Sequence, residues 1–381
     1  MSSTFGKSSR HQSSFHRSRL VSAFALAAFG TGCQRPINMP LALKDQTAFR
    51  AEAIQFLEEA AFGDKASQRM QAIEAFKDVA PAEAMSRMII SSNIESDSPG
   101  VSFAALMAAG EIGAESLIDR IRTRAESADP HVRMAALFAL HRLGSTGQTG
   151  ELSHLLLDHA DARVRANAAL VIGRLNSAEH AKLLKVALGR EQKTAVKLQI
   201  LESLALLQDR YATERLMLDG YSEYPDQATA ALMMLVNARC PAAEELFWTR
   251  LAKSTDFPEV RLQAARGLAL LGYNDGLDLA LEYLFFRAPH HVTANDPAQQ
   301  QIARVRGLAA LALEAMAEPS ALAALKRAFE SADQSVYVRI AIARAAIRTI
   351  DMNRKQTAGW YGHLARDETI AHARPAGNAS E

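Results

Sequence analysis

The side chains best suited by type and spacing to do chemistry in this sequence form a row of basic residues, one in each of several similar segments. The row comprises Arg69, Arg133, Arg165, Lys197, Arg261, Arg306 and Arg339. Guanidinium groups bind carboxylates and phosphates through paired hydrogen bonds, so these candidate partner-binding residues would suit an extended acidic or phosphorylated partner. A structural role is the alternative, because acidic residues stand at the turns that precede them. These are Asp129, Asp161, Asp256 and Asp333. Since the charges come paired, the sequence favours ion pairing with the preceding turn or with a neighbour's counterpart.

A second candidate is the stretch 287–300, which contains His290, His291 and Asp296. Two adjacent histidines rarely point at one ion, and no other His, Cys or carboxylate cluster has metal-ligand spacing, so no metal site is predicted. The two histidines are kept as candidate partner-binding residues, because a long loop in a repeat protein often carries specificity. A plain surface loop is the alternative.

Motifs of the common enzyme classes are missing from the sequence. It contains no glycine-rich phosphate loop, no GxSxG, no HExxH and no CxxC. We therefore predict no catalytic residue, no small-molecule substrate and no cofactor, and classify the chain as a non-enzyme.

The elements that would position these residues recur at a fixed spacing. Val132, Val164, Val196, Ala228 and Val260 head similar segments that start 32 residues apart. Weaker copies extend the series in both directions and give nine segments, anchored near residues 68, 101, 132, 164, 196, 228, 260, 305 and 338. Between 260 and 305 the spacing is 45, which places the extra residues in the 287–300 stretch. Constant spacing over so many copies is typical of a repeat protein.

Within each copy the apolar residues fall at steps 0, 4, 7, 8 and 11 from the anchor, as at Val132, Ala136, Ala139, Leu140 and Leu143. This pattern is one stripe of an α-helix, and the small residues at steps 4 and 7 should let a neighbouring helix approach closely. A second amphipathic segment lies between successive copies, for example 151–158, 179–188 and 242–251. The repeat is thus a helical hairpin that must stack on its neighbours, and we predict an all-α superhelix (solenoid) that forms a continuous rod.

The run Asp129-Pro130-His131-Val132-Arg133, which leads into Ala135-Ala136, resembles the HEAT-like repeat named after phycobilisome lyases. The resemblance covers about residues 46–350 and implies a solenoid of about nine HEAT-like hairpins. Adaptors, lyases and hydroxylases share this repeat, so it implies little about function. The deoxyhypusine hydroxylases among them hold two irons with His-Glu pairs, and none of the 11 histidines here is followed by Glu.

The N-terminus has the pattern of an export signal. A basic, serine-rich segment is followed by an uncharged stretch from Leu20 to Gly32, too short to span a membrane, and then by Cys33. The ending Gly30-Thr31-Gly32-Cys33 resembles a bacterial lipobox, which implies cleavage before Cys33 and a lipid on its thiol. Cys240, beside Pro241, is then unpaired and is interpreted as a structural thiol.

Charge argues against a nucleic-acid partner. Residues 1–32 contain four of the 43 basic residues and no acid, so residues 33–381 have 39 basic and 42 acidic residues, a formal net of −3. Nucleic-acid binding depends on a cationic surface, which this balance does not provide.

We therefore predict a signal peptide (1–32), a linker (33–45), a repeat solenoid (46–350), and a C-terminal cap and tail (351–381) in which Trp360 and Tyr361 cover the last hairpin. The predicted function is a non-catalytic scaffold in the bacterial cell envelope. It would be anchored in the membrane through Cys33, face the periplasm or exterior, and bind another protein or a peptide along the solenoid. The alternatives are a lyase-like protein that cradles a cofactor and a cytoplasmic nucleic-acid binder.

Overall fold

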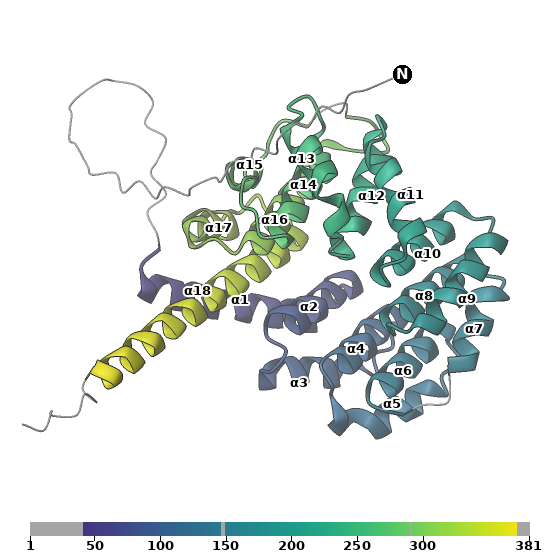
Figure 1. Ribbon diagram of the computed structural model, residues 1–381. Coiled ribbons are helices and arrows are strands. Elements are labelled where there is room, and N and C mark those ends of the chain that lie inside the picture. The colour runs from purple at the N-terminus through teal and green to yellow at the C-terminus, as the bar shows by residue number, and fades with distance from the viewer. Residues whose placement is uncertain (1–40, 146–148, 290–291, 372–381) are drawn as a thin grey trace, which may run out of the picture. The chain divides into compact units, whose positions relative to one another are not determined.

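The structure is a computed structural model that describes residues 41–145, 149–289 and 292–371, with the side chains of 149 and 356–371 left aside. All of them lie in one compact unit, Asn38–Glu381. Within these residues the chain forms eighteen α-helices and three short 3-10 turns and no strand, so the predicted all-α solenoid is confirmed. Successive helices pair into nine hairpins (Figure 1), the number that the sequence predicts.

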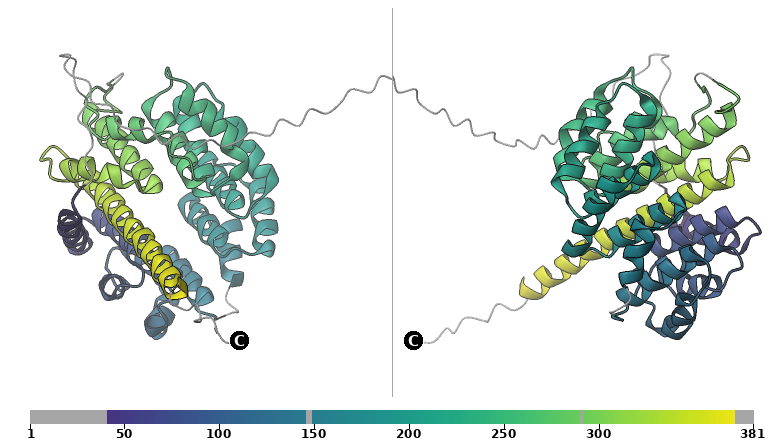
Figure 2. Two further views of the ribbon diagram at one scale, coloured as in Figure 1. Left: turned by 60° about the vertical axis from the view of Figure 1, so that its left-hand side comes forward. Right: turned by 90° about the vertical axis from the view of Figure 1, so that its right-hand side faces the viewer.

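The second helix of each hairpin contains the repeat anchor, and these even-numbered helices form the inner layer (Figures 1 and 2). They are α2 (Ala66–Val79), α4 (Pro99–Glu111), α6 (Pro130–Arg142), α8 (Ala162–Arg174), α10 (Thr194–Leu206), α12 (Pro225–Asn237), α14 (Pro258–Leu270), α16 (Ala298–Met316) and α18 (Val336–Ala371). The outer helices are α1 (Leu43–Phe62), α3 (Ala84–Asn93), α5 (Ile118–Ala125), α7 (Thr149–Leu157), α9 (Ala178–Arg190), α11 (Arg210–Gly220), α13 (Glu244–Ala252), α15 (Leu277–Tyr283) and α17 (Leu322–Phe329).

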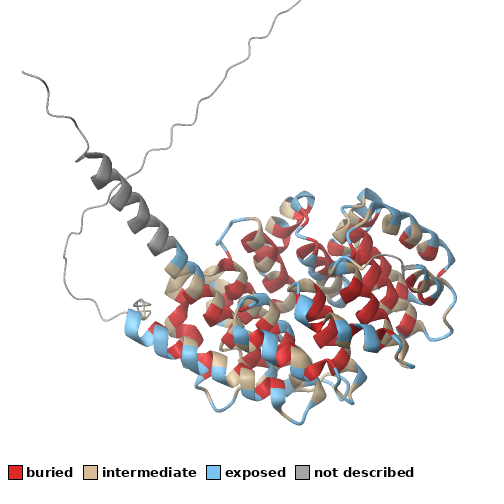
Figure 3. Ribbon diagram, turned by 90° about the horizontal axis from the view of Figure 1, so that it is seen from below, coloured by how far each residue is buried: buried red, intermediate tan, exposed pale blue. Residues whose placement is uncertain are grey.

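The core lies between the two helical layers, where buried positions alternate with exposed ones along each ribbon (Figure 3). It consists of the apolar stripe that the sequence pattern predicts: Val132, Ala136 and Ala139 are at most 1% exposed. Because no single hairpin encloses its own stripe, burial depends on the next hairpin, as expected for a repeat protein.

Neighbouring inner helices come into close contact where two small residues meet. A Cβ atom on Gly110 of α4 would lie 2.8 Å from Cα of Ala139 on α6. The equivalent pair two repeats further is Gly173 of α8 and Ser203 of α10, where the Cβ would lie 2.6 Å from Cβ of Ser203. Ala139 and Ser203 both occupy step 7 of their repeats, so the predicted role of small residues at this step is confirmed.

Aspartates at the turns begin two of the inner helices. Asp129 accepts hydrogen bonds from the backbone N–H groups of His131 and Val132 at 2.8 and 3.1 Å. Asp161 accepts one from the backbone N–H of Arg163 at 2.8 Å. These bonds satisfy donors that have no partner within the helix, and they fix where α6 and α8 start.

The nine hairpins close on themselves and do not form the predicted rod. Helix α18 packs against α1 and α2, so the last hairpin covers the first (Figure 1). Arg50 of α1 donates two hydrogen bonds to Asp351 of α18, at 2.7 and 2.9 Å. The ring of Phe329 lies edge-on to Phe49 and Phe56 with centroids 5.5 and 5.4 Å apart. We call this set of contacts the seam.

Closure has a simple physical reason. An open stack exposes an apolar face at each end and needs a polar cap there, whereas a closed array buries each end against the other. Helix α18 also continues to Ala371 through the boundary expected at residue 350. The side chains of Trp360 and Tyr361, to which a capping role was assigned, lie outside the described residues.

Candidate functional site

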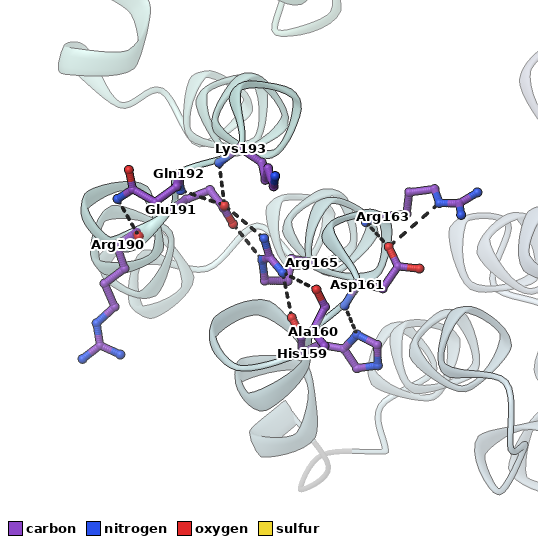
Figure 4. Close-up of polar contacts among 9 residues, drawn as sticks. All are labelled: His159, Ala160, Asp161, Arg163, Arg165, Arg190, Glu191, Gln192 and Lys193. Atoms are coloured by element: carbon purple, nitrogen blue, oxygen red, sulfur yellow. Dashed lines mark hydrogen bonds and ion pairs between the residues drawn. The ribbon is translucent and has the colours of Figure 1, made fainter.

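The row of basic residues is mostly engaged within the chain, as Arg165 illustrates (Figure 4). Its guanidinium donates to both carboxylate oxygens of Glu191 at 2.8 and 3.1 Å, and to the carbonyl oxygens of His159 and Ala160 at 2.8 and 3.0 Å. The hydrogen bond from Arg165, together with backbone N–H groups at residues 192 and 193, lowers the pKa of Glu191 to about 2. Arg165 therefore ties the turn before α8 to the turn before α10.

Other members of the row have similar roles. Arg133 pairs with Glu151 of the following helix and donates to the carbonyl oxygen of Ser127 at 2.6 Å. Arg306 bonds to Asp333 at 3.1 Å, and the guanidinium of Arg339 lies over the ring of Phe56. Arg69 donates a hydrogen bond to the side-chain oxygen of Asn93, and Arg261 donates one to the carbonyl oxygen of Leu251. Lys197 is half-buried on α10.

This arrangement favours the structural interpretation of the row but changes its detail. Only Arg306 bonds to one of the expected turn aspartates, and this is the following hairpin's Asp333. Asp129 and Asp161 accept from helix N–H groups, so Arg133 and Arg165 bond instead to turn carbonyl groups and to the glutamates of the next hairpin. Asp256 pairs with Arg250 at 2.9 Å and not with Arg261.

Several residues singled out in the sequence lie outside the described part of the chain: Cys33, His290 and His291. Among the described residues no three His, Cys, Asp or Glu side chains are grouped to hold a metal ion. None of the described helices combines the length and the apolar character that crossing a bilayer requires. Cys240 is buried, in agreement with the structural role predicted for it.

The inner helices surround a polar cavity of about 480 Å³, which we call the lumen. Residues of α2, α4, α8, α10, α14, α16 and α18 and of the end of α12 line it, so segments far apart in the sequence contribute to one site. Six basic and five acidic side chains face it. They are Lys77, Arg174, Arg239, Arg266, Arg344, Arg348, Glu74, Asp78, Glu111, Glu202 and Glu314.

A connected network of ion pairs occupies part of this wall, with Lys77 and Asp78 joined at 3.3 Å. Glu111 bonds to Lys77 at 2.6 Å and to Arg174 at 2.8 Å. Arg344 bonds to Glu314 at 2.8 Å and to Asp78 at 2.9 Å, and so joins α18 to both α16 and α2. Burial disfavours the charged form of Arg344, but the attraction of these carboxylates outweighs it and raises its pKa.

Other lumen charges lack such compensation. Burial lowers the pKa of Arg266, and repulsion from Arg344 acts in the same direction, against the attraction of Glu314 and Asp78. Burial likewise raises the pKa of Glu74, although Lys77 acts in the opposite direction. Uncompensated charges inside a protein are costly to keep and often mark a binding site.

A second hollow, of about 310 Å³, lies between α12, α14 and the beginning of α16. We call it the aromatic groove, and its apolar wall includes Met233, Phe257, Pro258 and Phe286. Phe257 precedes Pro258 at the start of α14, and Tyr224 precedes Pro225 in the same place on α12. Neither side chain caps its helix, and they are 42% and 75% exposed. These are the positions that Asp129 and Asp161 occupy in earlier repeats.

The charged side of the groove includes the end of the insertion. Arg304 of α16 bonds to Glu259 of α14 at 2.9 Å and holds both carboxylate oxygens of Asp296 at 2.9 and 3.0 Å. This contact lowers the pKa of Asp296 and fastens the end of the insertion against α14. Asp226 is exposed and has no ion-pair partner among the described residues, so the groove is net acidic.

Neither hollow was identified from the sequence, although both leave a signal in it. Polar residues recur at steps 6 and 10 of the repeat, as in Glu202, Arg266 and Arg344 at step 6, and these steps line the lumen. The sequence signal for the groove lies at the residue before the proline that starts the inner helix. This residue is aspartate at 129 but aromatic at 224 and 257.

Comparison with known proteins agrees with the architecture. Residues 89–158 match the model of HEAT repeats. No match to a curated protein was found. Among solved structures, the complex of CpcE and CpcF of phycocyanin lyase from Nostoc sp. PCC7120 is similar, with 15% identity, a TM-score of 0.38 and coverage of 65% of this chain and 93% of that one.

Human deoxyhypusine hydroxylase in complex with glycerol is also similar, with 16% identity, a TM-score of 0.33 and coverage of 82% of this chain and 100% of that one. Kap121p matches with 13% identity and a TM-score of 0.31, over 77% of this chain and 37% of that one. None of these likenesses bears on activity or ligand. The match at 89–158 and the helical hairpins that recur through the described residues together give this part of the chain the architecture of a HEAT-like repeat array.

Proposed function

We propose that this protein is a non-catalytic scaffold that binds a segment of a partner protein in the aromatic groove, while a lipid on Cys33 anchors it to a bacterial cell-envelope membrane. The partner-binding part of this proposal rests on one observation. Tyr224 and Phe257 occupy helix-start positions where aspartates in other repeats form capping bonds, and both are exposed. An aromatic residue there forgoes about 1 kcal/mol of capping stability.

Stability is commonly given up where a residue serves binding. Phe257 lines the apolar hollow, whereas Tyr224 only adjoins its residue Pro225. An exposed aromatic side chain beside such a hollow is a typical anchor for a partner's side chain. Met233 adds an adaptable apolar surface next to Phe257. The groove thus offers a contact for one or two apolar side chains of an inserted segment.

The groove's charge indicates the kind of segment. Arg304 is fully engaged with Glu259 and Asp296, which leaves an excess of carboxylates and an exposed Asp226 at the rim. We therefore expect a segment with an apolar residue next to a lysine or arginine, since complementary charge orients a partner and excludes others.

A photo-crosslinking amino acid at position 233, in cells that express the full chain, tests this function. We expect a discrete crosslinked partner that disappears in Phe257→Ser and Asp226→Lys. The matched control is Tyr211→Ser, which changes an exposed aromatic residue on α11, outside the groove, and should leave the product intact. The proposal fails if the product persists in Phe257→Ser, or if a probe at position 211 gives the same pattern.

The anchor is tested separately. Cys33→Ser should move the protein from the membrane fraction to the soluble fraction and should abolish labelling with a fatty-acid analogue. Unchanged membrane association with no label would contradict the lipid anchor and leave the groove proposal standing.

The lumen supports one other candidate function, the cradling of a cofactor, because its volume lies in the range of small-molecule sites. Visible absorbance of the purified protein, lost on denaturation and extraction, would favour this alternative.

A further inference from the structure

The lumen contains basic groups that the chain itself does not use. Arg266 of α14 has no hydrogen-bond or ion-pair partner among the described residues, and Nε of Arg348 on α18 is buried without a hydrogen bond. Arg348 follows Arg344 by one helical turn, so both side chains lie on the same face of α18. Arg344, in contrast, already engages Glu314 and Asp78.

Such guanidinium groups are costly to retain in a cavity. A half-buried charge without a bonding partner loses part of its hydration, and the charges of Glu314 and Asp78 make good only part of that loss for Arg266. Glu314, whose side chain is 6% exposed, is the acid that attracts Arg266 most strongly. Its carboxylate, however, accepts a hydrogen bond from Nε of Arg344 at 2.8 Å. Asp78, which also attracts Arg266, bonds to Arg344 as well, so neither carboxylate is free to pair with Arg266 alone.

We propose that Arg266 and Arg348 form a binding site in the lumen for a small ligand that bears one carboxylate or phosphate group. Guanidinium donors suit both oxyanions, and the lumen's volume of about 480 Å³ suits a small molecule. This site is separate from the aromatic groove and does not depend on the function proposed there.

The acids of the lumen narrow the class of ligand. Glu74 on α2 and Glu202 on α10 face the same cavity without an ion-pair partner among the described residues. They would repel a chain of phosphates, so an extended nucleic acid fits poorly. A compact molecule with a single anionic end, and with neutral or cationic groups elsewhere, suits this division of charge.

Thermal unfolding of the full chain, with inorganic phosphate and with acetate as separate probes, tests the site. Sodium chloride at equal ionic strength serves as the reference, because unspecific screening would then act equally. We expect at least one probe to raise the Tm in a saturable manner, as a ligand that binds only the folded state does. Stabilisation by phosphate alone or by acetate alone identifies which oxyanion the site takes.

The variants Arg266→Met and Arg348→Met separate binding from folding. Each should weaken the probe's affinity by about tenfold or more, the effect of losing one charge-assisted hydrogen bond. Arg266→Met should also have an unchanged or higher Tm without a ligand, because it removes an uncompensated charge. The control Arg87→Met changes an exposed arginine on α3 and should bind like the unchanged protein.

Two results would overturn the proposal. One is that neither phosphate nor acetate stabilises the protein beyond the sodium chloride reference. The other is that both lumen variants are stabilised by the probe as strongly as Arg87→Met.

Discussion

At the scale of single residues, the energetics centre on ion pairs that join one turn to the next. Glu191 is the clearest case, because Arg165 and two backbone N–H groups all donate to it and lower its pKa from 4.5 to about 2. A carboxylate whose pKa is lower in the folded state stabilises the fold at pH values above its ordinary pKa. That contribution is lost as the pH falls from about 4.5 towards 2.

The substitution Glu191→Gln should therefore cost about 2 kcal/mol of unfolding free energy at pH 7, a usual value for hydrogen bonds to a charged group. The difference between the unchanged protein and the variant should shrink steadily below pH 4.5. Urea unfolding at several pH values measures it, with Glu179→Gln, at an exposed position of α9, as the control. A difference that stays constant down to pH 2 would show that the charge of Glu191 does not stabilise the fold.

At the scale of elements, some inner helices begin with a capping aspartate and α14 begins with Phe257, which forms no cap. Substitutions at position 257 can therefore separate an effect on stability from an effect on binding. Replacing Phe257 with serine supplies the missing cap at the start of α14, whereas replacing it with alanine removes the ring and adds no cap. We expect Phe257→Ser to be more stable than Phe257→Ala by about 1 kcal/mol. Chemical denaturation measures the difference, and both variants should lose the partner crosslink. Equal stability of the two would mean that position 257 is not a capping position.

The helical elements could be predicted from the sequence because their signals are local. A stripe at steps 0, 4, 7, 8 and 11, repeated every 32 residues, fixes the inner helices, and Asp129 and Asp161 mark where two of them begin. The partners of Arg133 and Arg165 were harder to predict. A turn aspartate can cap its own helix or bond to an arginine, and the sequence pattern is the same in the two cases, so it does not distinguish them.

At the scale of the whole array, closure escaped prediction because it depends on contacts between residues about 300 positions apart. The pair of Arg50 and Asp351 has no periodic signature, and neither has the edge-on contact of Phe329 with Phe49. With closure unforeseen, an open curved surface was the natural expectation for a partner site. The lumen and its unpaired Arg266 exist because the ends meet, so they could not be deduced from any one repeat.

Closure also changes how the array should unfold. In an open stack each hairpin contacts only its neighbours, so loosening the last one leaves the first unaffected. In a closed array the first and last hairpins are neighbours, and a break in the seam exposes both. Asp351→Arg places a positive charge beside Arg50, at a site where both side chains are at most one-quarter exposed. The seam should then open by like-charge repulsion.

Hydrogen exchange measured by mass spectrometry distinguishes the two cases. We expect Asp351→Arg to increase exchange in α1, α2, α17 and α18 together, with α8 and α10 on the far side of the lumen unaffected. Asp275→Arg makes the same change at an exposed residue outside the seam and should alter none of these helices. An increase confined to α17 and α18 would mean that the ends touch without stabilising each other. Helix α18 is held in place by α16 on one side and by α1 and α2 on the other. Without stabilisation from α1 and α2, α18 would not be a fixed wall of the lumen, and an anion site formed by α14 and α18 requires such a wall.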